Sequence, residues 1–201
     1  MNPRVFVLTL CTFAFGSAAF IFAGLLEPMA KDLGVSTAVA GQLQTAYVLT
    51  SALLGPVAAW LLGQMDRKLV VITGLGLALV LHLACSLAPD FETLLVLRAL
   101  AGLAGAMSGP AASVAAASLV PPERRGSALA MVSGGMTLAF VVGIPIGSVA
   151  GAIFDWRATF IVAAILAAIA LIGVIFFLPP VPAPPKREGG RVSISALWPL
   201  Y

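Results

Sequence analysis

The amino-acid sequence predicts an all-α membrane protein with six transmembrane helices. Three observations support this class: 61% of the 201 residues are hydrophobic, only 9% are charged, and six charge-poor apolar segments are each about one bilayer long. The mean hydropathy of +1.09 lies far above the range of soluble domains. A soluble protein of this length has too small a core to hide so much apolar surface.

The six predicted spans have the length that a bilayer requires. At a rise of about 1.5 Å per residue, some 20 helical residues cross a hydrocarbon core of about 30 Å. The uncharged run of the first segment is longer than the apolar region of a secretory signal, so we expect it to be retained as an anchor. The predicted spans are 5–26, 41–62, 69–87, 93–119, 127–154 and 158–178.

The connecting segments contain residues that start and stop helices. Asp90 and Asp155 are expected to cap the fourth and sixth helices, and Pro121 and Pro122 end the fourth. Residues 179–201 begin with five prolines among seven residues and continue with charged and glycine residues. We therefore predict a cytoplasmic linker and tail there instead of a seventh span.

The distribution of basic residues predicts the orientation. Cytoplasmic loops of membrane proteins carry an excess of Lys and Arg. With both termini in the cytoplasm, the inner segments hold eight basic residues, the outer segments hold two, and Arg98 lies inside a span. The inner residues are Arg4, Arg67, Lys68, Arg124, Arg125, Lys186, Arg187 and Arg191, and the outer ones are Lys31 and Arg157.

Composition excludes several classes of function. A formal charge of +3 is too small to indicate nucleic-acid binding. Cys11 and Cys85 both fall inside apolar spans, where free thiols pack as small hydrophobic groups. We expect no metal site and no cofactor.

Polar residues in the second span predict a cavity. Gln42, Gln44, Thr45 and Tyr47 lie in its first turns, and polar groups in hydrocarbon are costly unless they face a bundle interior or a wet cavity. We predict that these four side chains, with Ser108 of the fourth span, line a cavity. The sixth span has no polar side chain between 160 and 178 and is expected to face lipid.

Glycines recur along one face of the fourth span and along one face of the fifth. Small residues allow helix backbones to approach closely, so we predict that these two spans pack against each other in the interior. Simple packing and a moving hinge both remain open as explanations. The glycines are Gly102, Gly105 and Gly109 in the fourth span, and Gly134, Gly135, Gly143, Gly147 and Gly151 in the fifth.

Arg98 is the most informative single residue. It lies about six residues, or roughly 9 Å, inside the outer end of the fourth span, where a charge is costly. Its long side chain can reach the outer head groups or Glu27, or it can face a cavity and respond to a carboxylate, a substrate anion or a proton. The lone histidine, His82, receives no predicted role.

Several segments carry a family resemblance. In the run 94–106, Arg98 is followed four residues later by Gly102, which resembles the fourth-helix motif of the major facilitator superfamily. The run 143–147, Gly-Ile-Pro-Ile-Gly, followed by Gly151, is similar to the antiporter motif of the drug:proton antiporter branch. The segments 121–126 and 155–160 resemble the neighbouring parts of this pattern.

The segments 33–36 and 40–47 resemble the arabinose-efflux type within that branch. The resemblance implies the N-terminal half of a major facilitator fold, in which helices one to three and four to six form two inverted repeats. It also implies proton-coupled efflux of a small organic solute by alternating access, in the bacterial cytoplasmic (inner) membrane.

The resemblance further implies roles for three groups of residues. Arg98 modulates protonation or steadies the outward gate. Four residues of the fifth span form a tightly packed bending region, and three residues between the second and third spans latch the inner side. The bending region is Gly143, Pro145, Gly147 and Gly151, and the latch is Asp66, Arg67 and Lys68.

The expected partners are lipid, protons, a small-molecule substrate, and a second six-helix half or a second copy of the chain. A cavity built by one half has an open wall, so a non-transporting fragment or subunit is the alternative hypothesis. A more remote hypothesis is an intramembrane serine protease with Ser108 as nucleophile. His82 is then the candidate base, and it precedes the serine in the sequence.

Overall fold

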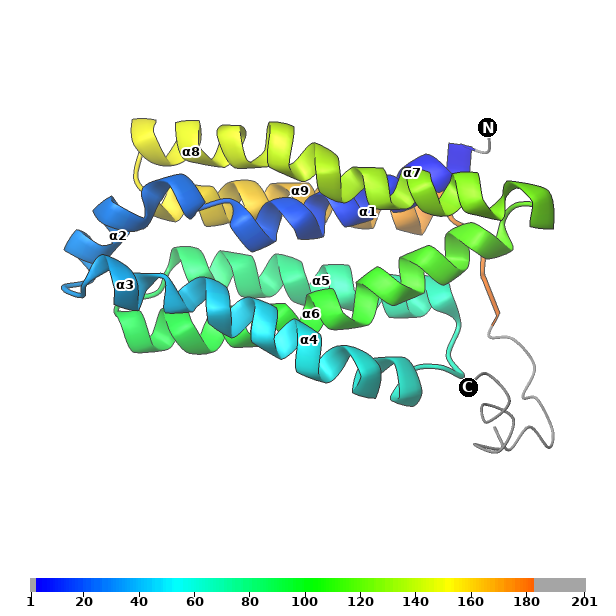
Figure 1. Ribbon diagram of the computed structural model, residues 1–201, viewed down its shortest axis with the longest axis horizontal. Coiled ribbons are helices and arrows are strands. Elements are labelled where there is room, and N and C mark those ends of the chain that lie inside the picture. The colour runs from blue at the N-terminus through cyan, green and yellow to red at the C-terminus, as the bar shows by residue number, and fades with distance from the viewer. Residues whose placement is uncertain (1–2, 183–201) are drawn as a thin grey trace, which may run out of the picture.

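The structure is a bundle of long helices that run side by side (Figure 1). This computed structural model describes residues 3–182, and every regular element within them is helical, which confirms the predicted all-α class. The elements are α1 (Pro3–Phe20), η1 (Ala23–Leu25), α2 (Leu26–Asp32), α3 (Thr37–Ala40), α4 (Gln42–Leu61), α5 (Arg67–Ser86), α6 (Phe91–Ser118), η2 (Pro122–Arg124), α7 (Arg125–Leu138), η3 (Ala139–Gly143), α8 (Ile144–Ile153) and α9 (Arg157–Phe177).

Five helical stretches of the described residues are long and apolar enough to cross a membrane: Pro3–Asp32, α5, α6, Pro122–Ile153 and α9. α4 coincides with the second predicted span and has 20 residues, but its glutamines and hydroxyl groups lower its hydropathy. It nevertheless lies alongside the other long helices in Figure 1. Of the predicted linker and tail at 179–201, only 179–182 falls among the described residues.

The packing pattern relates the first three spans to the last three. In the first set, α4 and α5 both pack against α6; in the second set, α7 and α9 both pack against α1. α5 and α9 also pack against each other. Exchanging the two sets of three spans leaves this pattern unchanged. Equivalent spans are three crossings apart and run in opposite directions, which is the arrangement of two inverted repeats.

The first span is broken near its outer third. α1 ends at Phe20, a turn follows, and the short helices η1 and α2 continue to Asp32. Pro28 lies in the first turn of α2 and lacks the N–H that would bond to the Gly24 carbonyl in a continuous helix. The break therefore has a local cause in the sequence.

The fifth span contains a wide turn. In η3 the Ile144 N–H donates to the Ala139 carbonyl, five residues back, so this turn is π-helical and holds one residue more than an α turn. Pro145 follows directly, and its ring cannot donate to the Val141 carbonyl and would clash with it in a regular helix. The proline thus accounts for the irregular turn.

Four of the five predicted glycines of the fifth span pack against the first span, not against the fourth as predicted. A Cβ atom added at Gly143 would collide with the Ser17 hydroxyl, and one at Gly147 would collide with the Ile21 side chain. Gly151 faces Leu25 in the same way. We call Gly135, Gly143, Gly147 and Gly151 the glycine stripe. All four of these glycines face the first span.

The glycines of the fourth span pack against α4. A Cβ at Gly102 would collide with the Tyr47 carbonyl oxygen, and one at Gly105 would lie 3.0 Å from the Tyr47 hydroxyl. Ser51 of α4 donates a hydrogen bond of 2.6 Å to the Gly102 carbonyl. Close backbone approach was predicted correctly for both spans, but the predicted pairing was wrong, because the fourth span packs its glycines against the second span and the fifth packs its glycines against the first.

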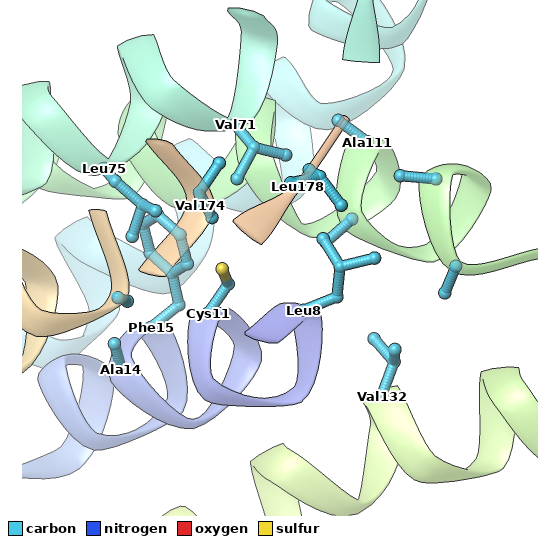
Figure 2. Close-up of a cluster of buried hydrophobic side chains, with 14 of the residues drawn as sticks. Leu8, Cys11, Ala14, Phe15, Val71, Leu75, Ala111, Val132, Val174 and Leu178 are labelled. Atoms are coloured by element: carbon cyan, nitrogen blue, oxygen red, sulfur yellow. The ribbon is translucent and has the colours of Figure 1, made fainter. Parts of the chain in front are cut away.

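A cluster of buried apolar side chains holds α1, α5, α6, α7 and α9 together. Figure 2 shows Leu8 and Cys11 of α1, Leu75 of α5 and Val174 of α9 directed toward one another. All four are fully buried. Much of α9 faces outward, and its exposed side chains include Ile165 and other large apolar groups, in agreement with a lipid-facing helix.

Replacing Gly147 by Ala is expected to lower the stability of the bundle. The new methyl group would lie 2.7 Å from the Ile21 carbonyl oxygen, so the backbones must separate, at a cost of about 1 to 3 kcal/mol. The control is Gly134→Ala, because a Cβ there has no atom within 4 Å. Thermal unfolding in detergent can be followed with a thiol-reactive fluorophore, since Cys11 and Cys85 are both buried. Equal melting temperatures for the two variants would contradict the proposed close packing.

Candidate functional site

Arg98 is completely buried in the N-terminal third of α6 and donates hydrogen bonds to backbone carbonyls of two other spans. Its Nη1 and Nη2 atoms each lie 2.9 Å from a carbonyl oxygen, those of Ala18 and Ala19. Its Nε donates to the Leu43 carbonyl at 3.4 Å, and Nη2 also reaches the Gln44 side-chain oxygen at 3.5 Å. The guanidinium therefore joins α6 to α1 and α4.

Aromatic rings complete the surroundings of Arg98. Its Cζ atom lies 4.5 Å from the centre of the Tyr47 ring and 4.7 Å from that of Phe22, and the ring of Phe160 is 6.0 Å away. Ring faces attract cations, most strongly where water is excluded. Among the described residues no carboxylate forms an ion pair with Arg98. The interpretation in which it extends to head groups or to Glu27 is therefore wrong.

The carbonyls that Arg98 binds belong to the last turn of α1. The final carbonyls of a helix have no donor within the helix, and cations there are favoured by the helix dipole. Because α1 ends at Phe20, the carbonyls of Ala18 and Ala19 need such a donor inside an apolar bundle. Arg98 supplies it, so the buried charge and the break in the first span stabilise each other.

A cavity of about 340 Å³ opens beside this site, between α1, α4, α6 and α7. We call it the central cavity; none of its lining residues is charged. The hydroxyl of Thr12 donates to the Val132 carbonyl and that of Ser51 to the Gly102 carbonyl, so both are already engaged. The lining residues are Thr12, Phe15, Ala19, Phe20, Tyr47, Val48, Ser51, Gly55, Gly105, Ala106, Gly109, Pro110 and Met136.

Arg98 does not line the central cavity. Ala19 and Tyr47 line it and also contact the guanidinium, so they separate the charge from the cavity. The expectation that Arg98 faces a cavity is thereby corrected to a position one residue layer behind its wall. A change at Tyr47 would alter both the cavity and the surroundings of the charge.

Of the five side chains predicted to line a cavity, only Tyr47 lines the central one. Gln44 binds Arg98, whereas Gln42 and Thr45 are exposed on another face of α4. Ser108 is completely buried against Gly74 of α5. Polarity alone did not identify the cavity lining, because Gln44 forms a hydrogen bond with Arg98 instead of facing the cavity.

The two phenylalanines of the cavity lining were not predicted from the sequence. Phe15 and Phe20 of α1 contribute to it, and Thr12 precedes them on a neighbouring turn. Their spacing fits one face of a helix, which is also the pattern of ordinary core residues. Nothing in that pattern distinguishes a cavity wall from packing.

The predicted latch residues link three helices at one end of the bundle. Asp66 caps α5 by accepting from the Lys68 N–H at 2.8 Å. The Arg67 guanidinium donates to the Leu62 and Gly63 carbonyls at the end of α4, at 3.2 and 2.7 Å. Lys68 Nζ donates to the Ile175 carbonyl of α9 at 2.9 Å. The contacts of these side chains thus join α4, α5 and α9.

A second polar cluster at the opposite end was not predicted. Asp32, at the end of α2, accepts from Arg157 at 2.8 Å and from the Trp156 indole at 3.0 Å. Arg157 also approaches the Ala88 carbonyl at 3.5 Å and stacks over the Trp156 ring. The cluster connects the end of the first span to the start of α9 and to the loop before α6. Asp32 and Arg157 are 125 residues apart, so local sequence gives no signal for their contact.

The arrangement required of a serine nucleophile is not found in the described residues. The Ser108 hydroxyl is buried without a hydrogen-bond partner there, and His82 bonds through Nδ1 to the Ala78 carbonyl of its own helix. Nucleophilic catalysis needs a base beside the hydroxyl. The protease hypothesis therefore has no support from this geometry.

Comparison with known proteins gives consistent matches. Residues 8–200 match the Major Facilitator Superfamily. The chain is 35% identical over 191 residues to the uncharacterized MFS-type transporter YfhI of Bacillus subtilis (strain 168), covering 93% of this chain and 47% of that protein. It is 33% identical over 200 residues to a chloramphenicol resistance protein of Streptomyces lividans, covering 98% and 51%. The chain spans about half the length of these curated relatives.

The fold has a counterpart among solved structures. The crystal structure of a peptide transporter, POT, in complex with sulfate superimposes with a TM-score of 0.75 at 20% identity, covering 87% of this chain and 37% of the other. At that identity the likeness concerns the fold. Together with the sequence match over residues 8–200, it leads to one conclusion: this chain belongs to the major facilitator superfamily of membrane transporters.

Proposed function

We propose that the chain forms half of an exporter that moves a small, uncharged, lipophilic solute out of the cell in exchange for protons. The observation that carries this proposal is the central cavity of about 340 Å³, whose lining contains no charged residue. Apolar and aromatic walls with few polar groups suit a ligand of the same chemistry.

The relative from Streptomyces lividans supports export as the direction, since its name is that of a chloramphenicol resistance protein. Chloramphenicol is an uncharged aromatic compound, which fits cavity walls of this kind. The proposed substrate class is therefore neutral aromatic compounds of similar size, and chloramphenicol is the first compound to test.

The proposal requires a second six-helix bundle. The central cavity is lined by only one set of six spans, and the chain corresponds to about half of its relatives. A second half or a second copy of this chain would close the open wall and allow the two bundles to rock about the site. Without it, the chain is the non-transporting subunit of the alternative hypothesis.

Arg98 has a gating role in this proposal. Its hydrogen bonds to Ala18 and Ala19 fix the first span at its break, next to Tyr47 and the central cavity. A change of partners at the guanidinium would release the outer part of the first span, and we propose that proton entry brings about this change. The glycine stripe and Pro145 allow the facing part of the fifth span to follow.

We propose the bacterial cytoplasmic (inner) membrane as the location, with both termini in the cytoplasm. The start of α1 and the segment that follows α9 lie at the same end of the bundle (Figure 1). There the Val181 carbonyl accepts from the Arg67 N–H at 2.9 Å. That end carries the latch residues Arg67 and Lys68, and the bias of basic residues toward the cytoplasm supports the orientation.

Filling the central cavity is expected to reduce transport about tenfold without unfolding the protein. A Cβ at Gly109 meets no atom within 4 Å, so Gly109→Leu places its side chain in the cavity without a backbone collision. Everted membrane vesicles with an imposed pH gradient should then accumulate about tenfold less labelled chloramphenicol, a loss equivalent to about 1.4 kcal/mol of binding.

The matched control is Gly134→Leu, which also adds a leucine to open space but outside the cavity lining. Its transport should equal that of the unmodified chain. Vesicles that hold the unmodified chain as a dimer or together with a second half, and that still accumulate no more chloramphenicol than vesicles lacking the chain, would refute the proposed substrate. Transport that survives Gly109→Leu would refute the proposed site.

Replacing Arg98 is expected to uncouple transport from the pH gradient. Arg98→Lys keeps the charge, but an ammonium group cannot reproduce the planar fork that bonds to two adjacent carbonyls. Losing a charged hydrogen bond costs about 1.5 to 3 kcal/mol, so gradient-driven efflux should fall about tenfold or more in Arg98→Lys and Arg98→Ala. Membrane insertion, measured by protease accessibility, should be retained. Unchanged gradient-driven efflux in either variant would rule out the gating role.

A further inference from the structure

Two arginines at the start of α7 lack ion-pair partners among the described residues. Arg124 ends η2, Arg125 begins α7, and both side chains are exposed. The ion pairs found in residues 3–182 all involve Arg157 at the opposite end of the bundle. The basic pair thus has no role in the fold comparable to that of Arg67 or Lys68.

The position of the pair is electrostatically unfavourable. The N-terminal end of a helix carries a partial positive charge and favours anions, so cations there repel it. No side chain caps the first N–H groups of α7. Glu123 is the one acidic residue in the segment 121–128, so the segment has a net positive charge. An anion bound at this end would relieve the repulsion.

Each arginine also lines an apolar cleft. Arg124 lines a cleft of about 170 Å³ between α1, the end of α6 and α7, with Ser127 as its other polar side chain. Arg125 lines a second cleft of about 320 Å³ beside the end of α6, with Val114, Ala117 and Pro182 as apolar walls and Ser118 as its other polar side chain. Both clefts therefore combine a guanidinium with aliphatic walls, at a level where membrane-spanning helices end.

We propose that Arg124 and Arg125, with these two clefts, form a binding site for an anionic glycerophospholipid. The phosphate lies against the guanidinium groups, and acyl chains lie along the aliphatic walls. Arginine is well suited to phosphate, and basic pockets between transmembrane helices recruit anionic lipid head groups. A soluble anion would use the arginines but gain nothing from the apolar walls. The site lies away from the central cavity and shares no lining residue with it.

The test measures lipid binding to the full chain in detergent by native mass spectrometry. Dioleoylphosphatidylglycerol and dioleoylphosphatidylcholine have the same acyl chains but differ in net charge. The unmodified chain should bind the anionic lipid about fivefold more tightly or better, since one basic residue near a membrane surface contributes about that factor. Arg124→Gln and Arg125→Gln should each lower this affinity about fivefold and leave phosphatidylcholine binding unchanged.

The control variant is Lys31→Gln, which removes one exposed positive charge outside both clefts. It should bind phosphatidylglycerol as the unmodified chain does. Because the arginines are exposed, the glutamine variants should keep their melting temperature, measured with the thiol-reactive fluorophore. Binding in detergent does not depend on orientation, so the known effect of basic loops on topology does not interfere.

Three outcomes would overturn the proposal. One is equal affinity of the unmodified chain for both lipids, and another is unchanged phosphatidylglycerol binding in both glutamine variants. The third is displacement of the lipid by inorganic phosphate at equal concentration, which would indicate a simple anion site. None of these outcomes bears on transport of a neutral solute through the central cavity.

Discussion

The burial of the Arg98 guanidinium is the constraint on which the arrangement of the bundle depends. A buried guanidinium needs hydrogen-bond acceptors within the protein, and here these include backbone carbonyls of α1 and α4. The last carbonyls of a helix have no N–H donor within the helix, and those of Ala18 and Ala19 at the end of α1 are of this kind. The end of α1 and the first turn of α4 therefore both lie at the level of Arg98. One side chain thus sets the relative depth of three helices.

Small residues set the distances between the same helices. The glycine stripe admits the first span to within backbone contact, and Gly102 and Gly105 admit α4 to α6. Hydroxyl groups of Thr12 and Ser51 then bond across these contacts to carbonyls of the neighbouring span. In lipid there is no hydrophobic driving force between helices, so close packing and interhelical hydrogen bonds provide much of the attraction. The central cavity is lined by aromatic side chains together with Gly55, Gly109 and other small residues.

Sequence alone predicted the features that depend on local composition. The apolar spans, the cap at Asp90 and the close approach at glycines all follow from residues within a few positions of one another. The partners of those features depend on contacts across the bundle. A stripe of glycines indicates that some backbone comes near but not which one, so the fifth span was paired with the wrong neighbour. The carbonyl groups that bind Arg98 have no signature, because every residue has one. The residues that line the cavity were predicted incorrectly for a related reason. Gln44 binds the Arg98 guanidinium, and the lining consists largely of aromatic and small residues.

The π-helical turn in the fifth span has a consequence for the angular phase of that span. In a straight α-helix each step of four residues advances the facing direction by about 40°, so Gly135 and Gly151 would point about 160° apart. The additional residue in η3 turns the following segment back by up to about 100°, and Gly143, Gly147 and Gly151 keep the first span as their neighbour. The π-helical turn thus compensates for the angular drift of the helix, so that the glycines on both sides of the turn face the first span. If η3 were a regular α turn with the same sequence, α8 would be rotated by up to about 100°, and Ile146 would take the place of Gly147 against the first span. Deletion of one residue within 139–143 would instead remove the π-helical turn and leave α8 facing the first span.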